Sequence, residues 1–156
     1  MSKIVIRKMH SSDLDAVSDL AMLANPHAMK EKYSKHILDE LRKNSNLSFV
    51  AAVEGKVVGY VQADIHDGEA VLEDIAVAEE HQGKGVGKCL LARELKALKR
   101  EGVRIVLAEV HYKCASAIPF YYKHNFRITG FVQDYFGIGH DTIILKLVLQ
   151  KQRCLL

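Results

Sequence analysis

The chain has few of the features that mark secreted or metal-binding proteins. It has only three cysteines, Cys89, Cys114 and Cys154, which are far apart and form no CxxC pair. This pattern argues against a disulfide framework and against a zinc site. The histidines include no HxxxH or HExxH spacing, so we expect no metal ion.

Long apolar runs and strong charge are also missing. No apolar run approaches the roughly 18 residues that a membrane-spanning helix needs. Residues 1–7 lack the apolar stretch and cleavage site of a signal peptide, so we expect a cytoplasmic protein. The formal net charge of +3 is too small to indicate nucleic acid as the main partner. It suits a small polyanionic ligand, if the positive charge lies near a pocket.

The composition is that of a globular protein, with 49% hydrophobic and 26% charged residues. No repeat or linker divides the sequence, so we expect a single domain over residues 1–156. Periodicity and turn residues predict strands near 4–9, 47–53, 56–65, 69–77, 103–110, 126–133 and 140–148. They predict helices near 13–23, 28–42, 88–101 and 115–124. Short-turn strands pair antiparallel and strand–helix–strand units pair parallel, so we predict an α/β fold with a mixed sheet and helices on both faces.

A glycine-rich segment lies between the predicted strand at 69–77 and the next helix. Its residues are Gln82, Gly83, Lys84, Gly85, Val86, Gly87 and Lys88. Glycines let backbone N–H groups converge without obstruction, and a helix N-terminus adds partial positive charge. The two lysines add further charge. We therefore predict that this segment binds phosphate.

Spacing excludes two common phosphate-binding motifs. Read from Gly83, a Walker A loop puts Lys88 where its second glycine belongs, and Cys89 then stands where Ser or Thr is needed. The dinucleotide fingerprint GxGxxG likewise puts Lys88 at its third glycine. A glycine-rich turn without any ligand is the remaining alternative.

The spacing Gln-x-x-Gly-x-Gly, at Gln82, Gly85 and Gly87, resembles that of the GNAT superfamily of acetyl-CoA-dependent N-acetyltransferases. The order of predicted elements is similar along nearly the whole chain. The resemblance implies a mostly antiparallel sheet of about seven strands with a splayed parallel pair. It also implies that residues 82–88 hold the coenzyme A pyrophosphate. Backbone groups of three strand residues are implied to pair with the pantetheine arm, namely Ile75, Ala76 and Val77.

A second segment resembles the family pattern Asn-x-x-Ala-x-x-x-Tyr, followed by Gly-Phe. Ala117, Tyr121 and Phe126 match, whereas Cys114 stands where Asn is usual and Asn125 where Gly is usual. Asn tolerates the left-handed conformation that ends a helix, so the second change is mild. The resemblance implies that Cys114, Ala117 and Tyr121 lie beside the cofactor. Tyr121 is then the general acid for the departing thiolate, and aromatic packing is its alternative role.

Acetyl transfer to an amine also requires that the amine lose its proton. Glu109 ends the strand after the cofactor helix, twelve residues before Tyr121, an arrangement similar to that of ribosomal-protein N-terminal alanine acetyltransferases. We interpret Glu109 as the base, with a solvated strand-end carboxylate as the alternative role. Glu73 is the second candidate base, because it shares a strand face with Ile75 and Val77 and its side chain can face the cleft. We expect His111 to be a surface histidine.

Residues 135–142 resemble a motif of protein N-terminal acetyltransferases, roughly Tyr-Tyr-x-x-Gly-x-Asp-Ala. The matching residues are Tyr135, Gly139 and Asp141, and the departures are Phe136 and Thr142. The resemblance implies that Tyr135, together with Glu109, borders the acceptor. A plain hairpin loop with glycines at its turns is the alternative.

These observations predict an enzyme that transfers acetyl from acetyl-CoA to a primary amine. The preferred acceptor is a protein N-terminal α-amine, such as that of a ribosomal protein. A small-molecule amine (a polyamine, amino sugar or amino acid) is the alternative within this class. A non-catalytic acyl-CoA-binding module is the alternative from another class. We expect neither nucleic acid nor a membrane as partner, and a homodimer is left open.

Overall fold

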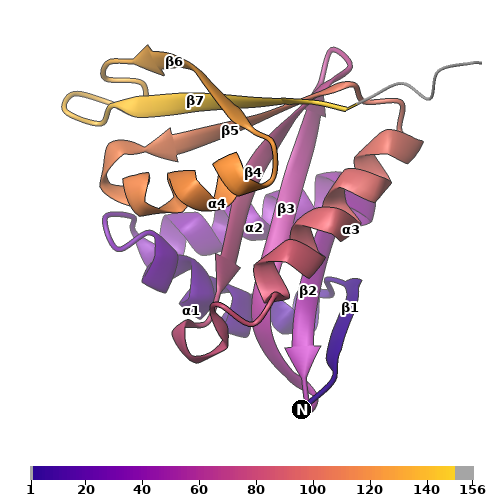
Figure 1. Cartoon of the computed structure of the whole chain (residues 1–156). Helices are drawn as coiled ribbons and strands as arrows, with labels where there is room; N and C mark the ends of the chain where they lie inside the picture. The colour runs from indigo at the N-terminus through magenta and orange to yellow at the C-terminus, as the bar shows by residue number, and fades with distance from the viewer. Residues whose placement is uncertain (1, 150–156) are drawn as a thin grey trace, which may run out of the picture. The chain divides into compact units, whose positions relative to one another are not determined.

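The structure, a computed structural model, describes residues 2–149 (Figure 1). It divides into two compact units. The first unit comprises residues up to 64 and residues 72–98, and the second comprises residues 65–71 and those from 99 onward. Cys154 lies outside the described residues. In the described range, no helix has both the length and the apolar character that a membrane crossing requires. The expectation of a single domain stays a prediction.

Four strands run through the first unit in the order β1-β2-β3-β4. They are β1 (Ile4–Lys8), β2 (Ser48–Val53), β3 (Lys56–His66) and β4 (Glu69–Val77). Residues 65–71, at the turn between β3 and β4, belong to the second unit. β1 and β2 pair antiparallel, as do β2 and β3, with a register shift at Ala51/Ala52. β2 and the middle of β3 are almost fully buried, which explains their near-continuous apolar sequences.

Helices α1 (Leu14–Ala24), α2 (Lys30–Lys43) and most of α3 (Val86–Arg100) belong to the same unit. Figure 1 shows α2 behind the strands and α3 in front of them. Ile37 and Leu41 are buried on α2, as are Leu90 and Leu98 on α3. α3 approaches β3 closely at Gly59, where an added Cβ would lie 3.0 Å from the Leu90 side chain.

The second unit contains β5 (Ile105–His111), β6 (Arg127–Val132) and β7 (Thr142–Val148) in the order β5-β7-β6. β7 pairs antiparallel with both neighbours, and His111 is opposite Thr142. A 3₁₀ segment η4 (Tyr112–Ala117) leads into α4 (Ile118–Lys123). α4 ends where Asn125 takes φ +70° and Phe126 N–H donates to the Tyr121 carbonyl at 3.1 Å. The left-handed conformation expected for Asn125 is confirmed.

Most predicted elements agree with the structure to within two or three residues, and the described residues confirm the mixed α/β class with seven strands. Two predictions were wrong in detail. α3 begins at Val86, so the last three residues of the predicted loop form its first turn. The helix predicted at 115–124 is partly 3₁₀, with a kink at Cys114. The splaying of a parallel strand pair stays a prediction.

Candidate coenzyme A loop and acceptor site

The glycine loop has a backbone that only glycine adopts readily. Gly83 and Gly85 have φ of +72° and +85°, and a Cβ added at either would meet no atom within 4 Å. The first helical hydrogen bond of α3 is donated by Cys89 to the Gly85 carbonyl at 3.0 Å. A helix leaves the N–H groups of its first turn without helical partners. The open loop and the start of α3 therefore suit a diphosphate, and Val86 itself is buried.

Two contacts connect this loop to β4 and β3. The side-chain amide of Gln82 donates to the Val77 carbonyl at 3.0 Å, so this predicted phosphate ligand also fixes the loop to the strand end. The N–H of Ala78 donates to the Val58 carbonyl at 2.8 Å, which holds the same strand end on β3. The loop is thus anchored independently of any ligand. The assignment of residues 82–88 to the cofactor stays a prediction.

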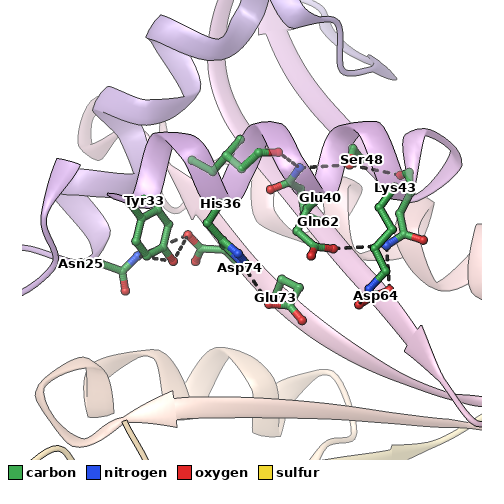
Figure 2. Close-up of polar contacts among 12 residues, drawn as sticks. Asn25, Tyr33, His36, Glu40, Lys43, Ser48, Gln62, Asp64, Glu73 and Asp74 are labelled. Carbon is green, nitrogen blue, oxygen red and sulfur yellow. Dashed lines mark hydrogen bonds and ion pairs between the residues drawn. The ribbon is translucent and has the colours of Figure 1, made fainter. Parts of the chain in front are cut away.

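β4 carries an acidic pair immediately before the predicted cofactor strand. The carboxylate of Glu73 forms a 3.3 Å ion pair with Nε2 of His36 on α2 (Figure 2). The hydrogen bond to Glu73 raises the pKa of His36, although burial opposes this shift. Because its carboxylate is already paired with His36, Glu73 is less available as a base than the sequence suggests.

Asp74 is the centre of a cluster that the sequence analysis missed. Its Oδ2 accepts a hydrogen bond from the Tyr60 hydroxyl. The same oxygen accepts from the Tyr33 hydroxyl at 2.9 Å and from the Asn25 amide at 3.3 Å (Figure 2). Its Oδ1 accepts from the Ile75 N–H at 2.9 Å, so one predicted pairing group for the pantetheine arm is already engaged. Burial raises the pKa of Asp74, and the two tyrosines and Asn25 partly oppose this shift.

In the second unit the structure brings together the two residues predicted to border the acceptor. The Tyr135 hydroxyl, in the β6–β7 loop, donates to Oε1 of Glu109 on β5 at 2.8 Å. Tyr135 is 46% exposed, so this pair is open to solvent. A carboxylate held by a phenol has a defined orientation and can still accept a proton on its other oxygen.

His111 was predicted to lie on the surface, and this prediction was wrong. The residue is only 6% exposed, and its Nε2 lies 2.9 Å from Nδ1 of His140. Its ring stacks on Tyr112, with centroids 4.8 Å apart, and lies 6.4 Å from the ring of Phe136. Burial arises because the β6–β7 loop folds back over the end of β5. The spacing of residues in the sequence does not predict that this loop folds back over the end of β5.

The remaining predicted site residues surround the start of α4. Tyr121 is 7% exposed, and its ring contacts Phe120 and Phe126 edge to face, at 5.6 and 5.3 Å between centroids. Aromatic packing is thus one role of Tyr121, and its role as general acid stays a prediction. Cys114 and Ala117 are half-buried in η4.

Comparison with known proteins identifies the family. Residues 14–126 match the model of the Acetyltransferase (GNAT) family. The chain belongs to the GNAT acetyltransferases. GNAT acetyltransferases use acetyl-CoA, and the glycine loop before α3 fits this cofactor because its backbone leaves room for a diphosphate. The activity of the chain is therefore acetyl transfer from acetyl-CoA to an amine.

Several GNAT relatives are similar along most of the chain. An N-alpha-acetyltransferase of Sulfolobus acidocaldarius is 31% identical, over 90% of this chain and 89% of that protein. A spermidine N(1)-acetyltransferase of Thermoplasma acidophilum is 30% identical, over 64% of this chain and 65% of that protein. The crystal structure of Ard1 from Thermoplasma volcanium is 25% identical with a TM-score of 0.86, and the match covers 95% of this chain and 99% of that one. The names of these relatives indicate more than one kind of acceptor amine.

Proposed function

We propose that this GNAT enzyme acetylates the α-amine of protein N-termini, and that residues 1–156 act as one cytoplasmic domain. The hydrogen bond from Tyr135 to Glu109 carries the proposal, since it joins the predicted base to the predicted acceptor-binding loop. The relative named N-alpha-acetyltransferase supports the same acceptor class.

Glu109 serves as the proton acceptor in this proposal. A protein α-amine has an ordinary pKa near 8, so about a tenth of it is already neutral at pH 7, and the carboxylate base removes one proton from the ammonium form. Tyr135 orients the Glu109 carboxylate and leaves one oxygen for the incoming ammonium group. The exposed position of Tyr135 suits an acceptor that is a long chain.

The coenzyme is held by residues of the glycine loop and of β4. Bound acetyl-CoA supplies an acetyl thioester, whose carbonyl carbon bonds to the amine nitrogen while the C–S bond breaks. Residues 82–88 bind the diphosphate through the loop and the first turn of α3, with Lys84 and Lys88 adding positive charge. Ala76 and Val77 provide backbone groups for the pantetheine arm, and Ile75 contributes its carbonyl, because its N–H is engaged by Asp74.

Tyr121 supplies the second proton transfer. Its phenol donates to the departing sulfur, which then leaves as a thiol. Burial among Phe120 and Phe126 fixes the ring in one position, which favours a directed proton donor. Cys114 and Ala117, in η4 just before α4, are further cofactor contacts in this proposal.

The test is acetylation of a peptide panel whose members differ only in their first residue, each paired with a copy blocked at its N-terminus. Spermidine is assayed alongside, and thiol release is measured together with the position of the acetyl group by mass spectrometry. We expect turnover of the open peptides, with acetyl on the α-amine and no reaction of the blocked copies. Turnover of spermidine alone, or acetyl on lysine side chains alone, contradicts the proposal.

A further inference from the structure

The buried His111 and the half-buried His140 join two segments that are 29 residues apart in the chain. His111 ends β5, two residues after Glu109, and His140 ends the β6–β7 loop that carries Tyr135. The contact therefore connects the same two segments as the hydrogen bond between Tyr135 and Glu109. It does so from a position withdrawn from water, whereas the Tyr135 contact is exposed.

The surrounding hydrogen bonds define the proton positions in this pair. The backbone N–H of Lys113 points to Nδ1 of His111 at 3.1 Å, and an N–H group can only donate. Nδ1 of His111 must then be without a proton, so the neutral ring carries its proton on Nε2. Nε2 of His111 consequently donates to Nδ1 of His140. This direction makes Nδ1 of His140 the acceptor of the contact, and a single substitution can remove that acceptor.

The loop itself is well organised around His140. Its N–H donates to the Gly137 carbonyl at 2.9 Å, and its carbonyl accepts from the Phe136 N–H at 3.3 Å. The Asp134 carboxylate accepts from the Gly139 N–H at 2.6 Å. Phe136 follows Tyr135 directly, and the two rings contact edge to face at 4.9 Å between centroids. A displacement of His140 is thus transmitted to Tyr135 through Phe136.

We propose that His111 and His140 are positioning residues that hold the β6–β7 loop on the end of β5, so that Tyr135 is placed to bind the acceptor. The inference rests on the proposed function for its effect on a peptide acceptor. Neither histidine touches the reacting atoms in this proposal. Loss of the contact therefore weakens acceptor binding and leaves coenzyme A binding unchanged.

Two amide substitutions of His140 separate the roles of its nitrogens. In His140→Asn the side-chain oxygen takes the place of Nδ1 and still accepts from His111. In His140→Gln the amide reaches the place of Nε2, and the acceptor at Nδ1 is lost. Both residues are polar and uncharged, and His140 is only half-buried, so the pair forms a matched comparison. The kinetic constants for one peptide and the coenzyme A dissociation constant are measured for both.

We expect His140→Gln to raise the peptide KM about fivefold to tenfold, the effect of one net hydrogen bond, with kcat changed less than twofold. For His140→Asn we expect a peptide KM within about twofold of the wild-type value. Equal peptide KM values for the two variants overturn the proposal, as does a loss confined to kcat.

A spectroscopic measurement tests the contact without any acceptor. Long-range ¹H–¹⁵N spectra of the wild type at pH 8 should show His111 as the Nε2–H tautomer, and hydrogen exchange at Phe136 and Gly139 should accelerate in His140→Gln only. A His111 ring protonated at Nδ1, or identical exchange in both variants, overturns the inference. If the wild type acetylates no peptide, the proposed function fails, and these two measurements alone decide the positioning role.

Discussion

The hydroxyl of Tyr135 donates to the carboxylate of Glu109 across 2.8 Å, although 26 residues separate the two in the chain. Each was assigned to the acceptor site on separate grounds, Glu109 by its place at a strand end and Tyr135 by a loop motif. Their contact allows the two roles to be separated by experiment.

Replacement of Glu109 by Gln keeps the shape and removes the base. We expect kcat for a peptide to fall about 100-fold or more, because the amine then loses its proton only to water. The coenzyme A dissociation constant should not change. An unchanged kcat would show that Glu109 is a solvated strand-end carboxylate and not the base.

Tyr135→Phe removes only the hydroxyl that orients Glu109. We expect the peptide kcat/KM to fall about fivefold, the effect of one net hydrogen bond. Tyr122→Phe is the matched control, because Tyr122 is another exposed tyrosine of the same unit and its ring, 4.0 Å from the Arg127 guanidinium, is kept. A kcat/KM change of the same size in both variants contradicts a specific role for Tyr135.

Gly85→Ala places a methyl group in the loop at φ +85°. The left-handed conformation costs an alanine about 1 to 2 kcal/mol, so the free energy of unfolding should fall by that amount. The new Cβ meets no protein atom within 4 Å and therefore points into space that a diphosphate can use, so coenzyme A binding should weaken by at least about tenfold.

Gly55→Ala is the control for that variant. Gly55 has φ +78° and is equally unobstructed, but it lies in the β2–β3 turn. We expect the same loss of stability, measured by urea unfolding, with unchanged coenzyme A affinity by calorimetry. Equal affinity of the two variants for coenzyme A would show that the glycine loop does not bind the coenzyme.

Glu94 is a buried carboxyl on α3 with neither oxygen hydrogen-bonded by any residue in the range 2–149. Burial raises its pKa from 4.5 to about 9. The folded protein therefore holds one more proton than the unfolded chain between these values, and its stability falls as pH rises through that range. Below about 4.5 both states are protonated, and above about 9 the loss is complete.

Glu94→Gln cannot ionise, so its stability should not follow this slope. We expect the variant to gain roughly 2 to 4 kcal/mol over the wild type between pH 5 and pH 8, measured by urea unfolding at both values. Glu101→Gln, in the exposed turn after α3, is the control and should leave the slope unchanged. If the free energy of unfolding varied with pH in the same way for the wild type and Glu94→Gln, the raised pKa of Glu94 would be refuted.

The hydroxyl of Tyr60 donates to Asp74 from a residue that is fully buried. Tyr60→Phe keeps the ring and removes this donor, so we expect a loss of about 1 to 2 kcal/mol in the free energy of unfolding. Tyr33→Phe should cost less, because Tyr33 is only half-buried. A larger loss for Tyr33→Phe than for Tyr60→Phe in urea titrations would show that burial does not control the strength of this cluster.

The order of strands and helices was predictable because neighbouring residues encode it. The turn at Asp67 and Gly68, both with positive φ, separates β3 from β4 as predicted. The glycines at 83 and 85 likewise adopt the left-handed conformation, which glycine adopts more readily than any other residue. α3 began earlier than predicted, because Gly85, and not Gly87, ends the loop.

The partners of the polar side chains were not predictable in this way. His111 and His140, or Glu73 and His36, meet only after distant segments pack together, and periodicity carries no information on such contacts. The burial of Glu94 also escaped notice, since a lone glutamate among basic helix residues has the pattern of a solvated face.

The sequence by itself determined the family, the loop before α3 and the residue types available for acetyl transfer, because these depend on spacing along one segment. Only the tertiary structure decided which of those residues act together. It paired Tyr135 with Glu109, engaged Glu73 with His36 and buried His111 against His140. The physical reason is that a hydrogen bond needs two atoms within about 3 Å, and for segments far apart in the chain the packing of the whole unit sets that distance.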